Sequence, residues 1–125
     1  MSYDYWIIKL DSDLNMLSEI TNENQLLPIG LTEDVKNKIE REIPTIKWDM
    51  ENELRGKSIH WGGSPDYGPQ FKIMFDSSEV GVKIVKVFTS SRIDFSDVVN
   101  RLAVALDASF ANLQTMEIHT SHDGR

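Results

Sequence analysis

The sequence predicts an α+β domain with a mostly antiparallel sheet and two main helices packed on one face. Two stretches have the spacing of amphipathic helices, and around them lie short segments rich in aromatic and β-branched residues. The order of the predicted segments, which is β, α, β, β, β, α, β, β, suggests an antiparallel sheet with helices on one face. A chain of 125 residues fits one domain. We therefore expect residues 1–125 to form a single α+β domain, with 119–125 as a loose tail.

The first 30 residues are predicted to contain one strand and little other regular structure. Residues 3–10, YDYWIIKL, are rich in aromatic and branched side chains and predict a strand. Residues 12–20 are compatible with one or two helical turns. Residues 21–30 predict a loop, because Asn, Pro and Gly interrupt regular structure.

Residues 31–44 predict the clearest helix of the chain. Thr32 can cap its start, and Pro44 ends it. Several of its charged side chains are four residues from a side chain of opposite sign, which indicates a solvated outer face. Its buried stripe recurs at every fourth position: Leu31, Val35, Ile39 and Ile43.

The next segments predict three strands, of which two form a hairpin. Residues 45–49 alternate briefly between apolar and polar side chains. Residues 71–76, FKIMFD, alternate cleanly, so Phe71, Ile73 and Phe75 share one face. Residues 80–88 form a β-branched run that is typical of a central strand. The short SSE turn between the last two segments predicts that they pair as a hairpin.

The C-terminal part predicts a second helix followed by a small hairpin. Residues 94–108 have helical spacing, with Asp94 or Ser96 as the cap. Residues 109–113 and 116–120 are short strand-like segments that can pair with each other.

Residues 60–69, HWGGSPDYGP, hold three of the seven glycines and two of the four prolines. The glycine spacing does not make a phosphate-binding loop, since the Lys and Ser or Thr that must follow it are missing and a strand follows instead of a helix. The simplest interpretation is a tight turn before a strand. Trp61 and Tyr67 either fold back onto the core or stand out as binding anchors. His60 is a candidate general base if Asp66 or Asp76 orients it.

The negative charge is concentrated in the first part of the chain. Residues 1–53 hold 12 acids and 5 bases, a net charge of −7, whereas 54–125 hold 8 of each. Such a field attracts basic partners and repels nucleic acid and membrane phosphates. The alternative is that it serves solubility. Asp49, Glu51 and Glu53 form the densest local group, which is either a solvated loop or a patch that meets a cationic surface.

The sequence lacks the motifs of several classes of function. There is no cysteine, so disulfides, thiol nucleophiles and thiolate metal sites are excluded. The spacing of His119 and His122 is not a standard metal pattern. We expect no cofactor and no metal site. The first residues lack a basic leader and a long apolar run, which predicts a cytoplasmic protein.

Three segments resemble a group of small acidic bacterial proteins associated with polymorphic toxins as their immunity proteins. The segments are MSYDYWI at 1–7, LPIGLTEDVKNKIEREIPTIKWD at 27–49 and LQTMEIH at 113–119. The shared pattern is a Leu-Pro-hydrophobic-Gly lead-in, an acidic-capped helix, a Pro break and a Trp-Asp strand. The sequence departs from that pattern after Asp49. The resemblance implies divergence where such proteins meet their toxins, so it makes residues 50–58 a candidate contact, and it implies no catalytic residue.

We therefore expect a non-enzymatic immunity protein that binds and neutralises a cognate, basic toxin domain through an acidic surface. Alternatives are a small enzyme or ligand-binding domain that uses the 60–69 loop with His60, and an oligomer whose sheet pairs with a copy of itself. The predicted partner-binding residues are Asp49, Glu51, Glu53, Trp61 and Tyr67.

Overall fold

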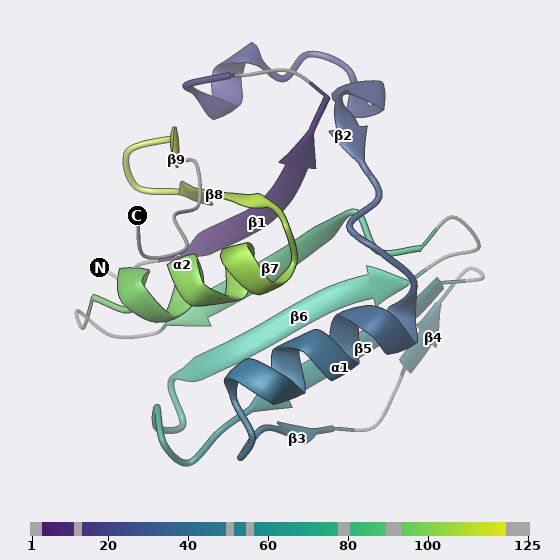
Figure 1. Cartoon of the computed structure of the whole chain (residues 1–125), viewed down its shortest axis with the longest axis vertical. Helices are drawn as coiled ribbons and strands as arrows, with labels where there is room; N and C mark the ends of the chain where they lie inside the picture. The colour runs from purple at the N-terminus through teal and green to yellow at the C-terminus, as the bar shows by residue number, and fades with distance from the viewer. Residues whose placement is uncertain are drawn as a thin grey trace.

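The computed structural model describes residues 4–11, 14–49, 52–54, 57–77, 81–89 and 94–119. Within these ranges two α-helices accompany one antiparallel sheet with the strand order β3-β5-β6-β7-β1-β8-β9, while β2 pairs with β1 and β4 pairs with β5 (Figure 1). The predicted fold class is thereby confirmed. The strands are β1 (Tyr5–Leu10), β2 (Leu26–Leu27), β3 (Lys47–Trp48), β4 (Asn52–Leu54), β5 (Lys57–Gly63), β6 (Phe71–Ser77), β7 (Ile84–Thr89), β8 (Ser109–Asn112) and β9 (Glu117–His119). The helices are α1 (Thr32–Glu42), α2 (Ser96–Ala105) and the 3-10 turns η1 (Leu17–Glu19) and η2 (Glu23–Gln25).

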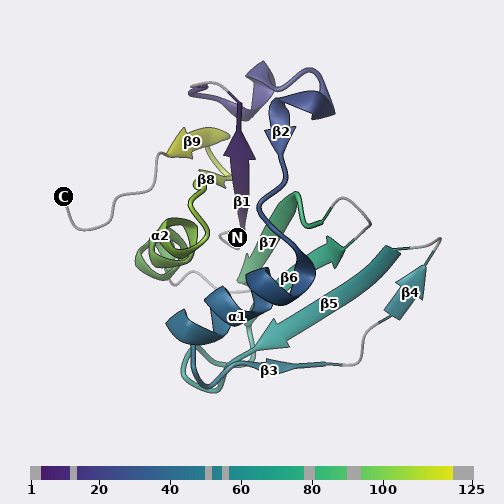
Figure 2. The same ribbon diagram turned by 45° about the vertical axis from the view of Figure 1, so that its right-hand side comes forward.

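Both α-helices cover the same face of the sheet (Figure 2). Strand residues alternate between the two faces, so every second side chain of β6 and β7 meets the helices. The helices bury Val35 and Ile39 from α1 and Val99 and Leu102 from α2. These side chains form the main core with inward-facing strand residues, which are Tyr5, Ile7, Phe71, Ile73, Phe75, Val85, Val87 and Phe110.

The two predicted helices are confirmed in position, with corrections at their starts. Residue 32 is already helical in α1, and Leu31 occupies the N-cap position without a side-chain hydrogen bond. The expected cap by Thr32 is therefore wrong. In α2 the N-cap residue is Phe95, so Ser96 is not the cap either. Asp94 lies one residue earlier, where its Oδ1 accepts a hydrogen bond of 2.8 Å from the backbone N–H of Ser96.

The main correction concerns the segment that was predicted as a turn. Residues 60–63 belong to β5, which lies between β6 and the short strands β3 and β4. The chain turns only afterwards, between Ser64 and Gln70. Two glycines suppress the strand signal in the sequence, but the structure uses one of them for close packing. A Cβ atom on Gly62 would lie 2.8 Å from both Ile46 Cδ1 and Trp48 Cζ3.

Other differences are smaller. The predicted loop at 21–30 contains η2 and the two-residue strand β2. Strand β7 begins at Ile84, while Val82 forms an isolated bridge with Gly30. The hairpins β6–β7 and β8–β9 are confirmed as antiparallel pairs. The predicted loose tail lies almost wholly outside the described residues, and its one described residue, His119, ends β9.

We predict that Gly62→Ala destabilises the protein by about 1–3 kcal/mol, because the new methyl group displaces the Trp48 ring. The ring cannot yield freely, since its Nε1–H donates a 2.9 Å hydrogen bond to Glu40 on α1. Urea unfolding followed by far-UV circular dichroism measures the effect. Gly30→Ala is the matched control: its Cβ would meet Val35 Cγ2 at an ordinary 3.6 Å. Equal unfolding midpoints for the two variants would contradict the packing argument.

Candidate functional site

Two of the predicted partner-binding residues, Asp49 and Trp61, lie side by side at one end of the sheet. Asp49 continues the extended backbone after β3, and its N–H donates a 2.8 Å hydrogen bond to the carbonyl oxygen of Trp61. Asp49 is exposed, whereas Trp61 is half-buried. The pairing of β3 with β5 therefore brings together two residues that are 12 positions apart in the sequence.

Of the remaining two acids of the predicted patch, only Glu53 belongs to the described residues. Glu51 lies outside the described residues. Glu53 is in β4, opposite Ser58 of β5, so its backbone runs along the same sheet edge as Asp49.

The surface around Asp49 carries both signs of charge. Asp49, Lys47 and Lys72 line a shared hollow of about 450 Å³, together with Gly63, Ser64, Pro65, Gly68 and Pro69 of the following turn. Two lysines and one aspartate therefore line the same hollow, so this edge is not purely acidic. The predicted acidic patch is thus bordered by lysines that sequence reading did not associate with it.

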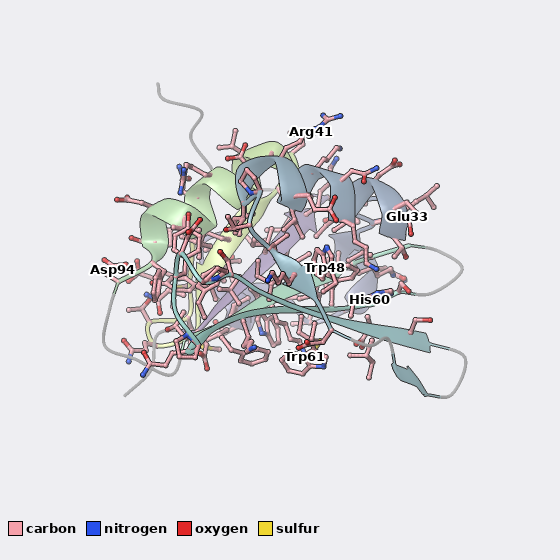
Figure 3. The ribbon with its side chains drawn as sticks, turned by 90° about the horizontal axis from the view of Figure 1, so that it is seen from below. Glu33, Arg41, Trp48, His60, Trp61 and Asp94 are labelled. Atoms are coloured by element: carbon pink, nitrogen blue, oxygen red, sulfur yellow. The ribbon has the colours of Figure 1, made fainter. Side chains whose placement is uncertain are left out.

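Trp61 projects from the sheet face that points away from the helices, opposite to Trp48 (Figure 3). Its ring stacks on Phe88 of β7, with 5.9 Å between ring centroids. Further along the same face, the Lys86 ammonium lies 5.4 Å from the centroid of the Trp6 ring. Sequence reasoning missed Phe88 and Trp6 as neighbours of this surface. The period-two alternation in their strands was the available signal, but strand order is needed to combine them.

Tyr67 lies apart from Trp61. Its ring packs against Phe71 and Phe95 at centroid distances of 5.0 and 6.1 Å, so it belongs to the helix side of the sheet. Its hydroxyl accepts a 3.1 Å hydrogen bond from Nη2 of Arg101 on α2. The Tyr67 ring thus folds back onto the core, which is the first of the two alternatives that the sequence left open. The two predicted anchors therefore do not form one patch.

His60 is almost fully buried, with 3% of its surface exposed. Its ring stacks on Phe75 at 5.0 Å, and Nε2 shares a 3.2 Å hydrogen bond with the Ser77 hydroxyl. Neither aspartate considered as its orienting partner is positioned for that role. Asp66 accepts a hydrogen bond from Thr45, and Asp76 is on the opposite face of β6 from Phe75. His60, Asp66 and Tyr67 thus have separate environments.

Asp94, which directly precedes the N-cap residue of α2, borders a second hollow, of about 360 Å³. The buried Tyr5 donates a 3.2 Å hydrogen bond from its hydroxyl to Asp94 Oδ1. The pKa of Asp94 is held below its ordinary value, first by the backbone N–H of Ser96, then by the Ser96 and Tyr5 hydroxyls. Ser96, Phe110, Asn112 and His119 complete the lining. In the part of the chain that the structure describes, no three His, Asp or Glu residues are grouped as metal ligands.

The lowered pKa of Asp94 predicts a specific dependence of stability on pH. A carboxyl group with a depressed pKa in the folded state stabilises the fold above its unfolded pKa of about 3.9. That contribution is lost as the pH falls through the folded value. We expect Asp94→Asn to be less stable than the parent protein at pH 6, with the difference shrinking below about pH 4. Urea unfolding at several pH values measures it; a difference that does not change with pH would contradict the assignment.

No described helix is long and apolar enough to cross a membrane. Comparison with protein-family models, with curated proteins and with solved structures finds no match to this chain. The geometry and charge of the chain are therefore the physical basis for a proposal about its function.

Proposed function

We propose that this protein is an immunity protein, which binds a cognate toxin domain with a basic surface and neutralises it. The observation that carries the proposal is the concentration of negative charge in one stretch of the sequence. Residues 10–35 hold six acids (Asp11, Asp13, Glu19, Glu23, Glu33 and Asp34) and neither Lys nor Arg. The resemblance of three segments to immunity proteins of polymorphic toxins supports the same proposal.

The fold gathers much of this acid-only stretch at one end of the molecule. The turns η1 and η2 and the strand β2 lie together where β1 ends, and α1 begins a few residues later (Figure 1). A concentrated negative field of this kind raises the encounter rate with a cationic protein, by roughly 10- to 1,000-fold in favourable cases. Because lysines border Asp49, this end supplies most of the attraction in our proposal, and Asp49 makes a local contact.

The open sheet face supplies aromatic groups of the type that hold a partner after encounter. Trp61 and Phe88 stack on each other on the face that the helices leave uncovered. Trp is enriched among interface residues whose truncation costs most affinity. A stable complex buries about 1,600 Å² in total, so one partner can cover this face and its β3–β4 edge together.

The decisive experiment is co-expression of the protein with the product of the neighbouring gene. We expect the host to survive expression of that product only when this protein is present, and we expect the two chains to co-purify. Survival without this protein, or lethality with it, removes the proposal.

We further predict that Glu33→Lys slows association with that toxin about two- to fivefold at low salt. The matched control is Asp97→Lys. Each residue is an exposed acid in the first turn of its helix, so each substitution changes net charge and helix-end electrostatics alike. Stopped-flow measurement of the association rate at two salt concentrations compares the two variants. Equal slowing by both variants would show that only total charge matters, not the position of the charge within the acid-only stretch of residues 10–35.

The predicted contact at the sheet edge has a separate test. Asp49→Lys adds a third cation to the hollow that Lys47 and Lys72 line. If a basic partner contacts this edge, we expect faster dissociation of the complex by at least about fivefold, through like-charge repulsion. Surface plasmon resonance measures the dissociation rate, and an unchanged rate excludes this edge from the interface.

A further inference from the structure

The sheet has a second, smaller core on the face away from the helices. Ile8 of β1, Leu17 of η1 and Ala111 of β8 are buried there. Segment 14–27 covers this end of the sheet, because its two ends are fixed to different strands. The N–H of Leu17 donates a 2.8 Å hydrogen bond to the carbonyl oxygen of Met116, and β2 pairs with Lys9 and Leu10.

This second core is incompletely filled. A hollow of about 430 Å³ remains between segment 14–27 and the strands beneath it. That volume is within the range of about 300–1,000 Å³ in which proteins bind small apolar groups. All the side chains that line it are apolar: Trp6, Ile8, Leu17, Ile20, Leu26, Leu113 and Met116.

Met116 marks the side of the hollow that is open to solvent. It is 43% exposed, and among the described residues only Leu31 is a more exposed large apolar side chain. Its backbone has a φ of 63°, a conformation that residues other than glycine adopt rarely. An apolar side chain is therefore kept at the solvent boundary of an apolar hollow.

The two segments that frame the hollow carry charge of one sign. Across residues 14–27 and 109–119 the acids are Glu19, Glu23 and Glu117, and there is no Lys or Arg. The Glu19 carboxylate accepts hydrogen bonds from the backbone of Asn15 and Met16, which fixes it beside the contact of Leu17 with Met116. On the strand side the Lys86 ammonium lies 5.4 Å from the centroid of the Trp6 ring, which lines the hollow, so the negative charge is confined to the two framing segments. An occupant that combines an apolar group for the hollow with a positive charge on the side of these two segments complements them.

We propose that this hollow, which we call the Met116 pocket, receives one large apolar side chain of the partner, flanked in the partner by Lys or Arg. The inference rests on the proposed function, since it names the chemistry by which the basic partner is recognised. Interface residues that dominate affinity commonly occupy well-packed pockets from which the surrounding contacts exclude water. The end of the molecule formed by η1, η2 and β2 then has two roles. It attracts the basic partner at long range, and it encloses the partner's apolar side chain on contact.

The pocket chemistry is testable without the partner, by two probes with the same indole ring and opposite charge. Tryptamine is a cation and indole-3-acetate is an anion at pH 7. We expect both to shift backbone amide NMR signals of Leu17, Ile20, Leu26, Leu113 and Met116. We expect tryptamine to bind about two- to fivefold more tightly at low salt, with the difference falling as salt is added. No shift at these amides, or equal affinity of the two probes, overturns the proposal.

Two variants and one control make the test specific to the pocket. Leu26→Trp fills the hollow and should abolish the shifts from both probes. Met116→Lys places a cation at the opening and should remove the preference for tryptamine. Leu31→Lys is the control, since Leu31 is an exposed apolar residue that does not line the pocket, and it should behave as the parent protein. If Leu26→Trp fails to fold, Met116→Lys alone decides, because retained preference for tryptamine in that variant overturns the proposal.

A final arm separates this inference from the proposed function. Once the toxin is identified, we expect that the Met116→Lys variant no longer protects the host in co-expression, whereas the Leu31→Lys variant still does. Protection by both variants would overturn the Met116 pocket as the site of the apolar anchor, but it would not affect the proposed immunity function. If the parent protein gives no protection but still prefers tryptamine, the proposed function fails and the pocket chemistry stands. A dimer in sedimentation velocity that Met116→Lys dissociates would assign the pocket to a second copy of the chain and overturn the proposal.

Discussion

Burial of one strand on both of its faces is the constraint on which the rest of the structure depends. β1 pairs with β7 along one edge and with β8 along the other. Tyr5 and Ile7 enter the core beneath the helices, and Ile8 enters the second core on the opposite face. Full burial of one such side chain contributes about 1.5–3 kcal/mol. Because β1 holds residues of both cores, neither layer can form without it, and segment 14–27 is positioned as its continuation.

The sequence predicted those elements whose signals are local. The helix at 31–44, the hairpin at 71–88 and the final hairpin each follow from side-chain periodicity within a few residues. Strand β5 was missed because Gly62 and Gly63 resemble a turn, whereas Gly62 is needed for the close approach of Trp48. No local pattern predicts that approach, since it depends on β3 pairing with β5.

The candidate site was less predictable for the same reason. Asp49 and Trp61 are brought together by strand pairing, while Tyr67, only six residues from Trp61, lies on the other side of the sheet. Lys72 approaches Asp49 from a strand whose position follows from the sheet order. Charge totals for halves of the chain are visible in a sequence. Which charges become neighbours is decided by strand order, and strand order brings Lys47 and Lys72 to the same hollow as Asp49.

The position of β1 in the sheet affects how early during synthesis the protein can complete its fold. The second partner of β1 is β8, where Ser109 pairs with Ile8 from 101 positions earlier in the sequence. Pairings so distant in sequence form late and slowly. Until β8 has been synthesised, the edge of β1 that it covers lacks this neighbour, and a nascent chain can expose that edge to other unfolded chains. For a protein that we propose protects a cell, the interval before protection therefore depends on the emergence of β8.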